Sequence, residues 1–200
     1  MGQRLVVTIN QHGEDIAKIY YHWSAYSLSA LHEVRDIINV LYDDENEEKD
    51  LRLRLIRFCE KNGGGIKGGT TSDEWTKIAE MYPNEVFKKE GISRNYGLIA
   101  LSEEGMKDLQ DWSEGDIYIN LDEDKVVNYV NYGYEDIDSY NAERAEWDDD
   151  FKALTLNDVP RITYDLCNFS VSDIDEIITE IESFDGYICR NDDCIYGLIA

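Results

Sequence analysis

The residues best suited to chemistry lie in the segment Tyr20–Ser27, which reads YYHWSAYS. Three tyrosines, one tryptophan, one histidine and two serines gather there, where a predicted strand leads into a predicted helix. Aromatic rings of this kind can bind a planar ligand, and a histidine can serve as a polar contact or proton donor. We therefore take Tyr21, His22, Trp23 and Tyr26 as a candidate ligand pocket. The alternative is an aromatic corner of the core, in which the hydroxyls and the imidazole find local partners.

A second candidate site is a group of carboxylates around one tryptophan in the acidic stretch that ends in EWDDD. An aromatic anchor ringed by carboxylates suits a protein interface, because the ring fills a pocket and the charges pair with arginine or lysine. Spaced carboxylates also resemble the phosphates of a nucleic acid. The alternative is a solvated acidic face. The predicted partner-binding residues are Glu135, Asp136, Asp138, Glu143, Glu146, Trp147, Asp148, Asp149 and Asp150.

Metal and cofactor chemistry find no support in the motifs. The three histidines are scattered, and no calcium-binding loop of the EF-hand type occurs. The four cysteines form no CxxC pair, so we expect neither a structural zinc nor a cofactor. Cys189 and Cys194 flank a predicted hairpin turn and could face each other; whether they pair stays open.

Two further motifs are weak. The glycine run at 63–69 precedes a predicted helix, whose first amides could hold a phosphate, but no GK[ST] follows at P-loop spacing. We interpret this run as a mobile linker. The triplet Glu123-Asp124-Lys125 matches part of a nuclease metal motif, yet it falls in a predicted hairpin turn that faces solvent.

The net charge of −24 is concentrated in the second half of the chain. Of 43 acidic residues 27 follow residue 102, but only 6 of the 19 basic ones do. Such a field repels nucleic acid and anionic membranes and attracts basic proteins, although solubility alone can also explain it. No apolar run is long enough to span a membrane, and the first residues lack the apolar core of a signal peptide. We expect a cytoplasmic protein without membrane contact.

Local patterns predict an α+β fold. Strands at 4–10 and 16–22 form a first hairpin, and helices with one apolar stripe follow, the third opened by a capping box from Thr71 to Glu74. The clearest hairpin joins 116–121 to 126–132; a helix rich in isoleucine, capped by Ser172, and a last hairpin at 187–200 close the chain. We expect a hairpin-plus-helices lobe at 1–92 and an acidic antiparallel α+β lobe at 93–200, or one continuous domain.

Three stretches carry a family resemblance: the opening MGQRL, the segment YYHWSAYS and SRNYGLIALSEEGMKDLQDW. Together they resemble small acidic proteins encoded by phages and prophages of Gram-positive bacteria, over the first two-thirds of the chain. The resemblance implies an accessory protein that acts against host defence, as anti-CRISPR inhibitors do, and it brings no catalytic residues with it.

These features lead to one functional prediction and two alternatives. The chain is predicted to be a non-enzymatic inhibitor that binds a basic, nucleic-acid-handling partner, such as a CRISPR nuclease, and occludes its nucleic-acid cleft. One alternative is a nucleotide- or RNA-directed enzyme, or a ligand-sequestering protein, that uses the segment Tyr20–Ser27. The other is a phage structural or housekeeping protein without inhibitory function.

Overall fold

A computed structural model describes residues 3–25, 27–88, 96–130, 137–147, 149–153, 155, 164–182, 187–190 and 196–199. The strands are β1 (Leu5–Gln11), β2 (Glu14–Tyr21), β3 (Gly65–Ile66), β4 (Leu98–Ala100), β5 (Gly115–Asn120), β6 (Lys125–Asn128), β7 (Asn168–Ser170), β8 (Tyr187–Arg190) and β9 (Tyr196–Ile199). The helices are α1 (Ser27–Leu41), α2 (Leu51–Lys61), α3 (Asp73–Met81), α4 (Glu103–Gln110), α5 (Ile137–Trp147) and α6 (Ile174–Glu182), with short 3₁₀ turns η1 (Gly69–Thr71) and η3 (Val171–Asp173). The predicted α+β class is confirmed.

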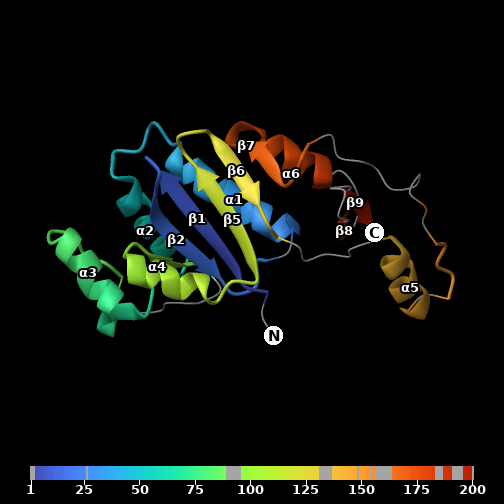
Figure 1. Cartoon of the computed structure of the whole chain (residues 1–200), viewed down its shortest axis with the longest axis horizontal. Coiled ribbons are helices and arrows are strands. Elements are labelled where there is room, and N and C mark those ends of the chain that lie inside the picture. The colour runs from blue at the N-terminus through green and yellow to red at the C-terminus, as the bar shows by residue number, and fades with distance from the viewer. Residues whose placement is uncertain are drawn as a thin grey trace.

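The main sheet has seven strands in the order β3-β4-β2-β1-β5-β6-β7 (Figure 1). The predicted hairpins are present as the antiparallel pairs β1–β2, β5–β6 and β8–β9. The sheet is mixed, because β1 also runs parallel to β5 and β3 runs parallel to β4. Strands from both sides of the predicted boundary at residue 92 therefore lie in one sheet.

The two faces of the sheet are covered differently. On one face Leu5, Val7 and Ile9 of β1 join the large core, which includes the buried stripes of α1, α2 and α6. The predicted apolar stripe of α6 is confirmed: Ile174, Ile177, Ile178 and Ile181 are all buried. On the other face a smaller cluster joins Val6, Tyr20 and Leu98 to Leu109 of α4. Figure 1 shows α4 in front of β2, while the front of β5 and β6 carries no helix of the described chain.

The glycine run is not the mobile linker that the sequence suggested. It contains the edge strand β3, and Gly64, Gly65 and Ile66 are buried. A side chain at Gly64 would put its Cβ 1.8 Å from the Gly97 carbonyl oxygen, so only glycine allows the two backbones to approach this closely. The composition of the run reflects tight packing against the β4 region.

The predicted capping box from Thr71 to Glu74 is wrong, because the capping residue is the next one along the chain and Glu74 does not bond back to it. Ser72 caps α3, and its Oγ accepts a hydrogen bond from Trp75 N. Glu74 is buried and turns instead toward the start of α4, where it accepts hydrogen bonds from Leu101 N at 2.6 Å and Ser102 N at 3.0 Å. The carboxylate thus ties α3 to the end of β4.

The predicted cap of the isoleucine-rich helix is also misplaced. Ser172 lies inside η3, and Ser170 is the residue whose side chain caps that turn, by accepting from Ser172 N. Ser102 caps α4, because its side chain accepts a hydrogen bond from Gly105 N.

No helix in the described part of the chain is long and apolar enough to cross a membrane.

Candidate functional site

Helix α5 presents the predicted partner-binding tryptophan to solvent. Trp147, at its C-terminal end, is 79% exposed, and Glu146, Asp149 and Asp150 beside it in sequence are exposed as well. Asp138 at the start of the helix is also exposed, and no side chain of α5 that the structure describes is buried. In Figure 1 α5 lies apart from the seven-stranded sheet. The helix therefore offers an indole and several carboxylates without contributing a described core residue.

The remaining predicted partner-binding residues cannot be placed in this way. Glu135, Asp136 and Asp148 lie outside the described residues, and Glu143 belongs to α5 without a described side chain. The candidate surface, called the α5 surface below, consists of the exposed residues at and just after the end of the helix: Glu146, Trp147, Asp149 and Asp150. Asp138 lies nine residues before Trp147, on the opposite face of the helix.

The structure separates the residues of the candidate ligand pocket. Strand alternation in β2 sends Tyr21 into the large core and Tyr20 into the smaller cluster under α4. His22 lies on the same side as Tyr20, and its Nδ1 is hydrogen-bonded to the Tyr20 hydroxyl oxygen at 2.7 Å. The ring of Trp23 lies edge-on to that of His22 at 4.9 Å, and Trp23 is 48% exposed. Tyr21 is therefore apart from the His22–Trp23 pair, and Tyr26 lies outside the described residues.

An aromatic ring and a lysine from elsewhere in the chain extend the cluster around Tyr20. Trp112, just after α4, meets the Tyr20 ring edge-on at 5.3 Å. Lys67 places its ammonium 5.9 Å from the Trp112 ring centre and pairs with Asp108 at 2.6 Å. Trp112 continues the spacing of Met106 and Leu109 beyond the end of α4, but nothing local indicated contact with Tyr20.

A buried polar group lies on the opposite side of β2. Ser24 Oγ donates to Glu33 Oε1 at 3.0 Å, and burial raises the pKa of Glu33 above its ordinary value. The fully buried Tyr21 hydroxyl lies beside Glu33, and burial raises the pKa of Tyr21 well above 10.0. This cluster was not predicted, because Glu33 looked like one more polar residue of α1.

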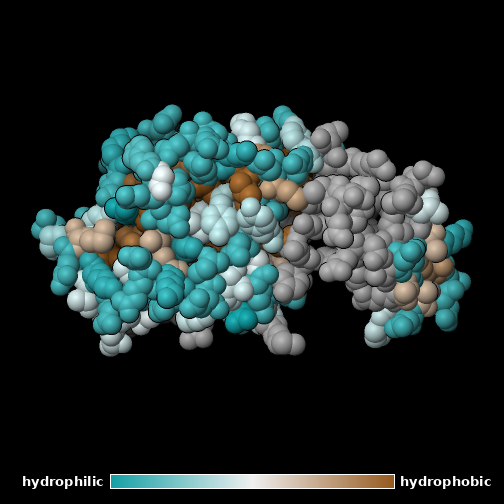
Figure 2. Space-filling view, viewed as in Figure 1, coloured by the Kyte–Doolittle hydropathy of each residue, from teal (hydrophilic) through white to brown (hydrophobic). Residues whose placement is uncertain are grey.

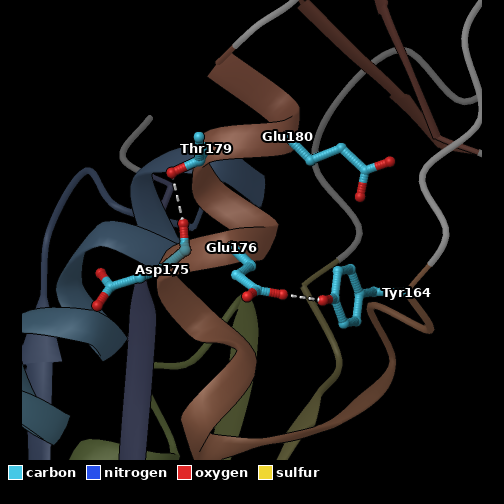
Figure 3. A pocket seen from close by; sticks show the side chains of 5 residues that line it. All are labelled: Tyr164, Asp175, Glu176, Thr179 and Glu180. Carbon is cyan, nitrogen blue, oxygen red and sulfur yellow. Dashed lines mark hydrogen bonds between the residues drawn. The ribbon is translucent and has the colours of Figure 1, made fainter.

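A shallow hollow on the outer side of α6 is lined by Tyr164, Asp175, Glu176, Thr179 and Glu180 (Figure 3). Its volume is about 490 Å³. The Tyr164 hydroxyl donates to Glu176 Oε2, and this bond raises the pKa of Tyr164 to about 12, because a phenolate there would face a carboxylate. Three of its five lining residues are acidic, so this hollow is part of the acidic surface formed by the second half of the chain.

Anion and metal sites gain no support from the described residues. The helix start behind the glycine run carries Asp73 and Glu74, so its electrostatics oppose a phosphate. Glu123 and Asp124 lie in the exposed turn between β5 and β6, as expected. Among the described residues no group of three or more histidine, cysteine or acidic side chains could hold a metal ion. Cys59 and Cys167 form no disulfide bond with a described cysteine, whereas a pair between Cys189 and Cys194 falls outside what the structure describes.

Comparison with known proteins adds no identification. No protein-family model, curated protein or solved structure matches the chain significantly.

Proposed function

We propose that the chain is a non-enzymatic binding protein that docks on a basic, nucleic-acid-handling partner and occludes its nucleic-acid cleft. The observation that carries the proposal is the α5 surface, where Trp147 is 79% exposed beside exposed Glu146 and Asp149. Large aromatic side chains at interfaces often supply much of the binding energy when they enter a pocket. The surrounding carboxylates favour a pocket with arginine or lysine at its rim.

The charge of the whole chain supports the same class of partner. A net charge of −24 attracts basic surfaces over many ångströms, and nucleic-acid clefts are basic because they bind phosphates. Carboxylates in such a cleft take the place of phosphates, so affinity should fall as salt rises. The resemblance to phage proteins makes an RNA-guided nuclease of a bacterial defence system the partner class that we would test first.

The test is capture of partners from bacterial lysate by the tagged protein at low and at high salt, with bound proteins identified by mass spectrometry. We expect a basic nuclease to be retained at low salt and released at high salt. Glu146→Lys combined with Asp149→Lys should abolish this retention, and Trp147→Ala should weaken it.

The matched control combines Asp44→Lys with Glu45→Lys, which changes the net charge equally at two exposed positions between α1 and α2. Retention in this control, together with loss in the α5 variant, supports the proposal. Equal retention in both would remove the α5 surface from it.

A second candidate function rests on the half-exposed Trp23 beside His22. These rings offer one stacking surface and one imidazole to a planar ligand such as a nucleotide. The same captured samples test it: a nucleotide that copurifies with the wild-type protein and is lost in His22→Ala would move the function to this site. Absence of any such ligand would leave these rings with a packing role.

A further inference from the structure

The turn after α2 contains the sole Asn-Gly pair of the sequence, formed by Asn62 and Gly63. Asn62 is the C-terminal cap of α2 and is exposed to solvent. Gly63 has a φ of 87° and leads into the glycine run that contains β3. The pair therefore joins an exposed helix end to the edge strand of the main sheet.

An asparagine that precedes a glycine can react with the backbone next to it. The Gly63 nitrogen gives up its proton and bonds to Cγ of Asn62, the Cγ–Nδ2 bond breaks, and ammonia leaves with that proton, so that a five-membered succinimide ring remains. Glycine favours this attack because no side chain crowds its nitrogen and its backbone turns freely. Water then opens the ring at either carbonyl carbon. One opening gives aspartate, and the other gives isoaspartate, whose main chain passes through Cγ and is one methylene longer.

The surroundings of Asn62 leave this reaction open. Its side-chain amide forms no hydrogen bond with any residue that the structure describes. The Gly63 N–H is held by one long hydrogen bond, with 3.3 Å between its nitrogen and Glu60 O. The ψ of 9° at Asn62 turns its side chain away from Gly63 N, so the last turn of α2 must open before the ring can close. Helix ends open locally at little cost in free energy, whereas core elements do not.

We propose that Asn62 is a site of spontaneous modification, at which loss of the side-chain amide slowly converts the folded protein into aspartate and isoaspartate forms. Asparagine is among the residues that limit the lifetime of proteins at high temperature. Asn84 is also exposed and lies in a turn after a helix, but Glu85 follows it, and that side chain crowds the attacking nitrogen. The reaction needs only water, and it does not rest on the proposed function.

The isoaspartate form should weaken the β3 edge of the main sheet. Gly64 is buried so close to Gly97 that an added Cβ would lie 1.8 Å from the Gly97 carbonyl oxygen. The same oxygen accepts a hydrogen bond from Gly65 N at 3.1 Å. Figure 2 shows a mostly hydrophilic exterior with hydrophobic residues set back beneath it, so stability depends on interior contacts of this kind. A chain lengthened by one methylene just before Gly64 must shift these two backbones.

The test follows both products in the folded protein. The protein is incubated at mildly alkaline pH, sampled over days and digested at acidic pH with a glutamate-specific protease, which releases residues 61–74 with Asn62 as their one asparagine. We expect mass spectrometry to show steady conversion of this peptide from amide to acid, while the peptide 81–85, which contains Asn84, stays unchanged. Isoaspartate is measured separately, as transfer of a labelled methyl group by an isoaspartyl methyltransferase.

Variants assign the product and its effect on the fold. Asn62→Gln should abolish methyl transfer to the aged protein, because glutamine must close a larger ring, and the matched control Asn84→Gln should leave it unchanged. The isoaspartate form, separated by chromatography, should have a thermal midpoint about 3 °C below that of unmodified protein, as a modest loss of packing gives in a chain of this size. Freshly purified Asn62→Asp carries the new charge without the methylene, so it should melt like wild type.

Three results would overturn the inference. They are conversion of the 61–74 peptide in urea-unfolded but not in folded protein over the same period, conversion of Asn84 as fast as that of Asn62, and conversion without methyl transfer. An isoaspartate form that melts with the unmodified protein would overturn the predicted effect on the sheet edge.

Discussion

Among single residues, Glu33 has a carboxyl group whose charged form is disfavoured by its partly buried surroundings. It lies on α1 above the buried Tyr21, and Ser24 Oγ supplies a hydrogen bond to its carboxyl group at 3.0 Å. In the described structure no lysine, arginine or histidine forms an ion pair with it, while Asp36 adds negative charge nearby. Burial therefore dominates and raises its pKa, which means that the folded protein binds this proton more tightly than the unfolded chain does.

Replacing this carboxyl group should change how stability depends on pH. Because the folded pKa is raised, Glu33 stabilises the fold when protonated, and this contribution is lost as pH rises through the folded pKa. Glu33→Gln keeps an acceptor for Ser24 but carries no charge, so it should increase the free energy of unfolding at about pH 7. The gain should shrink as pH falls through the folded pKa of Glu33 toward its ordinary value, as followed by urea unfolding across the range.

The control for Glu33→Gln is Glu45→Gln, which changes an exposed acid for which we expect no such trend. A Glu33→Gln protein that is less stable than wild type at neutral pH, or that differs from it equally at every pH, would contradict the argument.

Among the elements, α1 depends on a cation supplied by α2. The last carbonyls of a helix have no partner within it, and the end carries partial negative charge. Arg54 is only 7% exposed and donates to Val40 O and Leu41 O, each at 3.3 Å, and to Asp43 O at 3.0 Å. A further bond reaches Glu48 O, so backbone carbonyls balance the buried guanidinium.

Removal of this cation should weaken the fold through the end of α1. Arg54→Met keeps an apolar stem in the space but leaves buried carbonyls unsatisfied, so we expect a loss of about 3 kcal/mol in the free energy of unfolding. The matched control is Arg35→Met, which breaks a surface pair with the adjacent Asp36 and should cost less than about 1 kcal/mol. Similar losses in both, measured by urea unfolding, would show that Arg54 is not the cap that its contacts indicate.

The helices and strands could be predicted from local sequence patterns, but the contacts between distant elements could not. Period-2 and helical spacing located the hairpins and the stripes of α1 and α6, because those patterns are local and one face of each element is buried. The parallel pairing of β1 with β5 was not predicted, since it joins residues 5–10 to 115–120 through no shared pattern. The same limit hid the contact of Tyr20 with Trp112 and the bonds from Glu74 to the start of α4. The exposure of Trp147 and its neighbouring acids fits the sequence pattern, which needs only composition within a short stretch, and their role in binding stays a prediction.

Across the whole molecule, charge acts in opposite directions on folding and on binding. Like charges repel one another more strongly in the compact state than in the expanded chain, so a net charge of −24 lowers stability. The same field should strengthen association with a basic partner, because each carboxylate attracts it. Salt screens both effects, with a Debye length that falls from about 30 Å at 0.01 M to about 8 Å at 0.15 M.

Salt should therefore separate the two effects of charge. Between these salt concentrations we expect the thermal midpoint to rise by roughly 2–4 °C, which corresponds to about 1 kcal/mol for a chain of this size. Over the same range, retention of the basic partner should fall. Choline chloride should reproduce the effect of sodium chloride, because screening depends on ionic strength and not on a bound cation. A midpoint that falls with salt, or that rises with sodium alone, would show that bulk repulsion does not limit this fold. The acidic residues would then act through local contacts, such as those expected at Trp147, and not through the field of the whole chain.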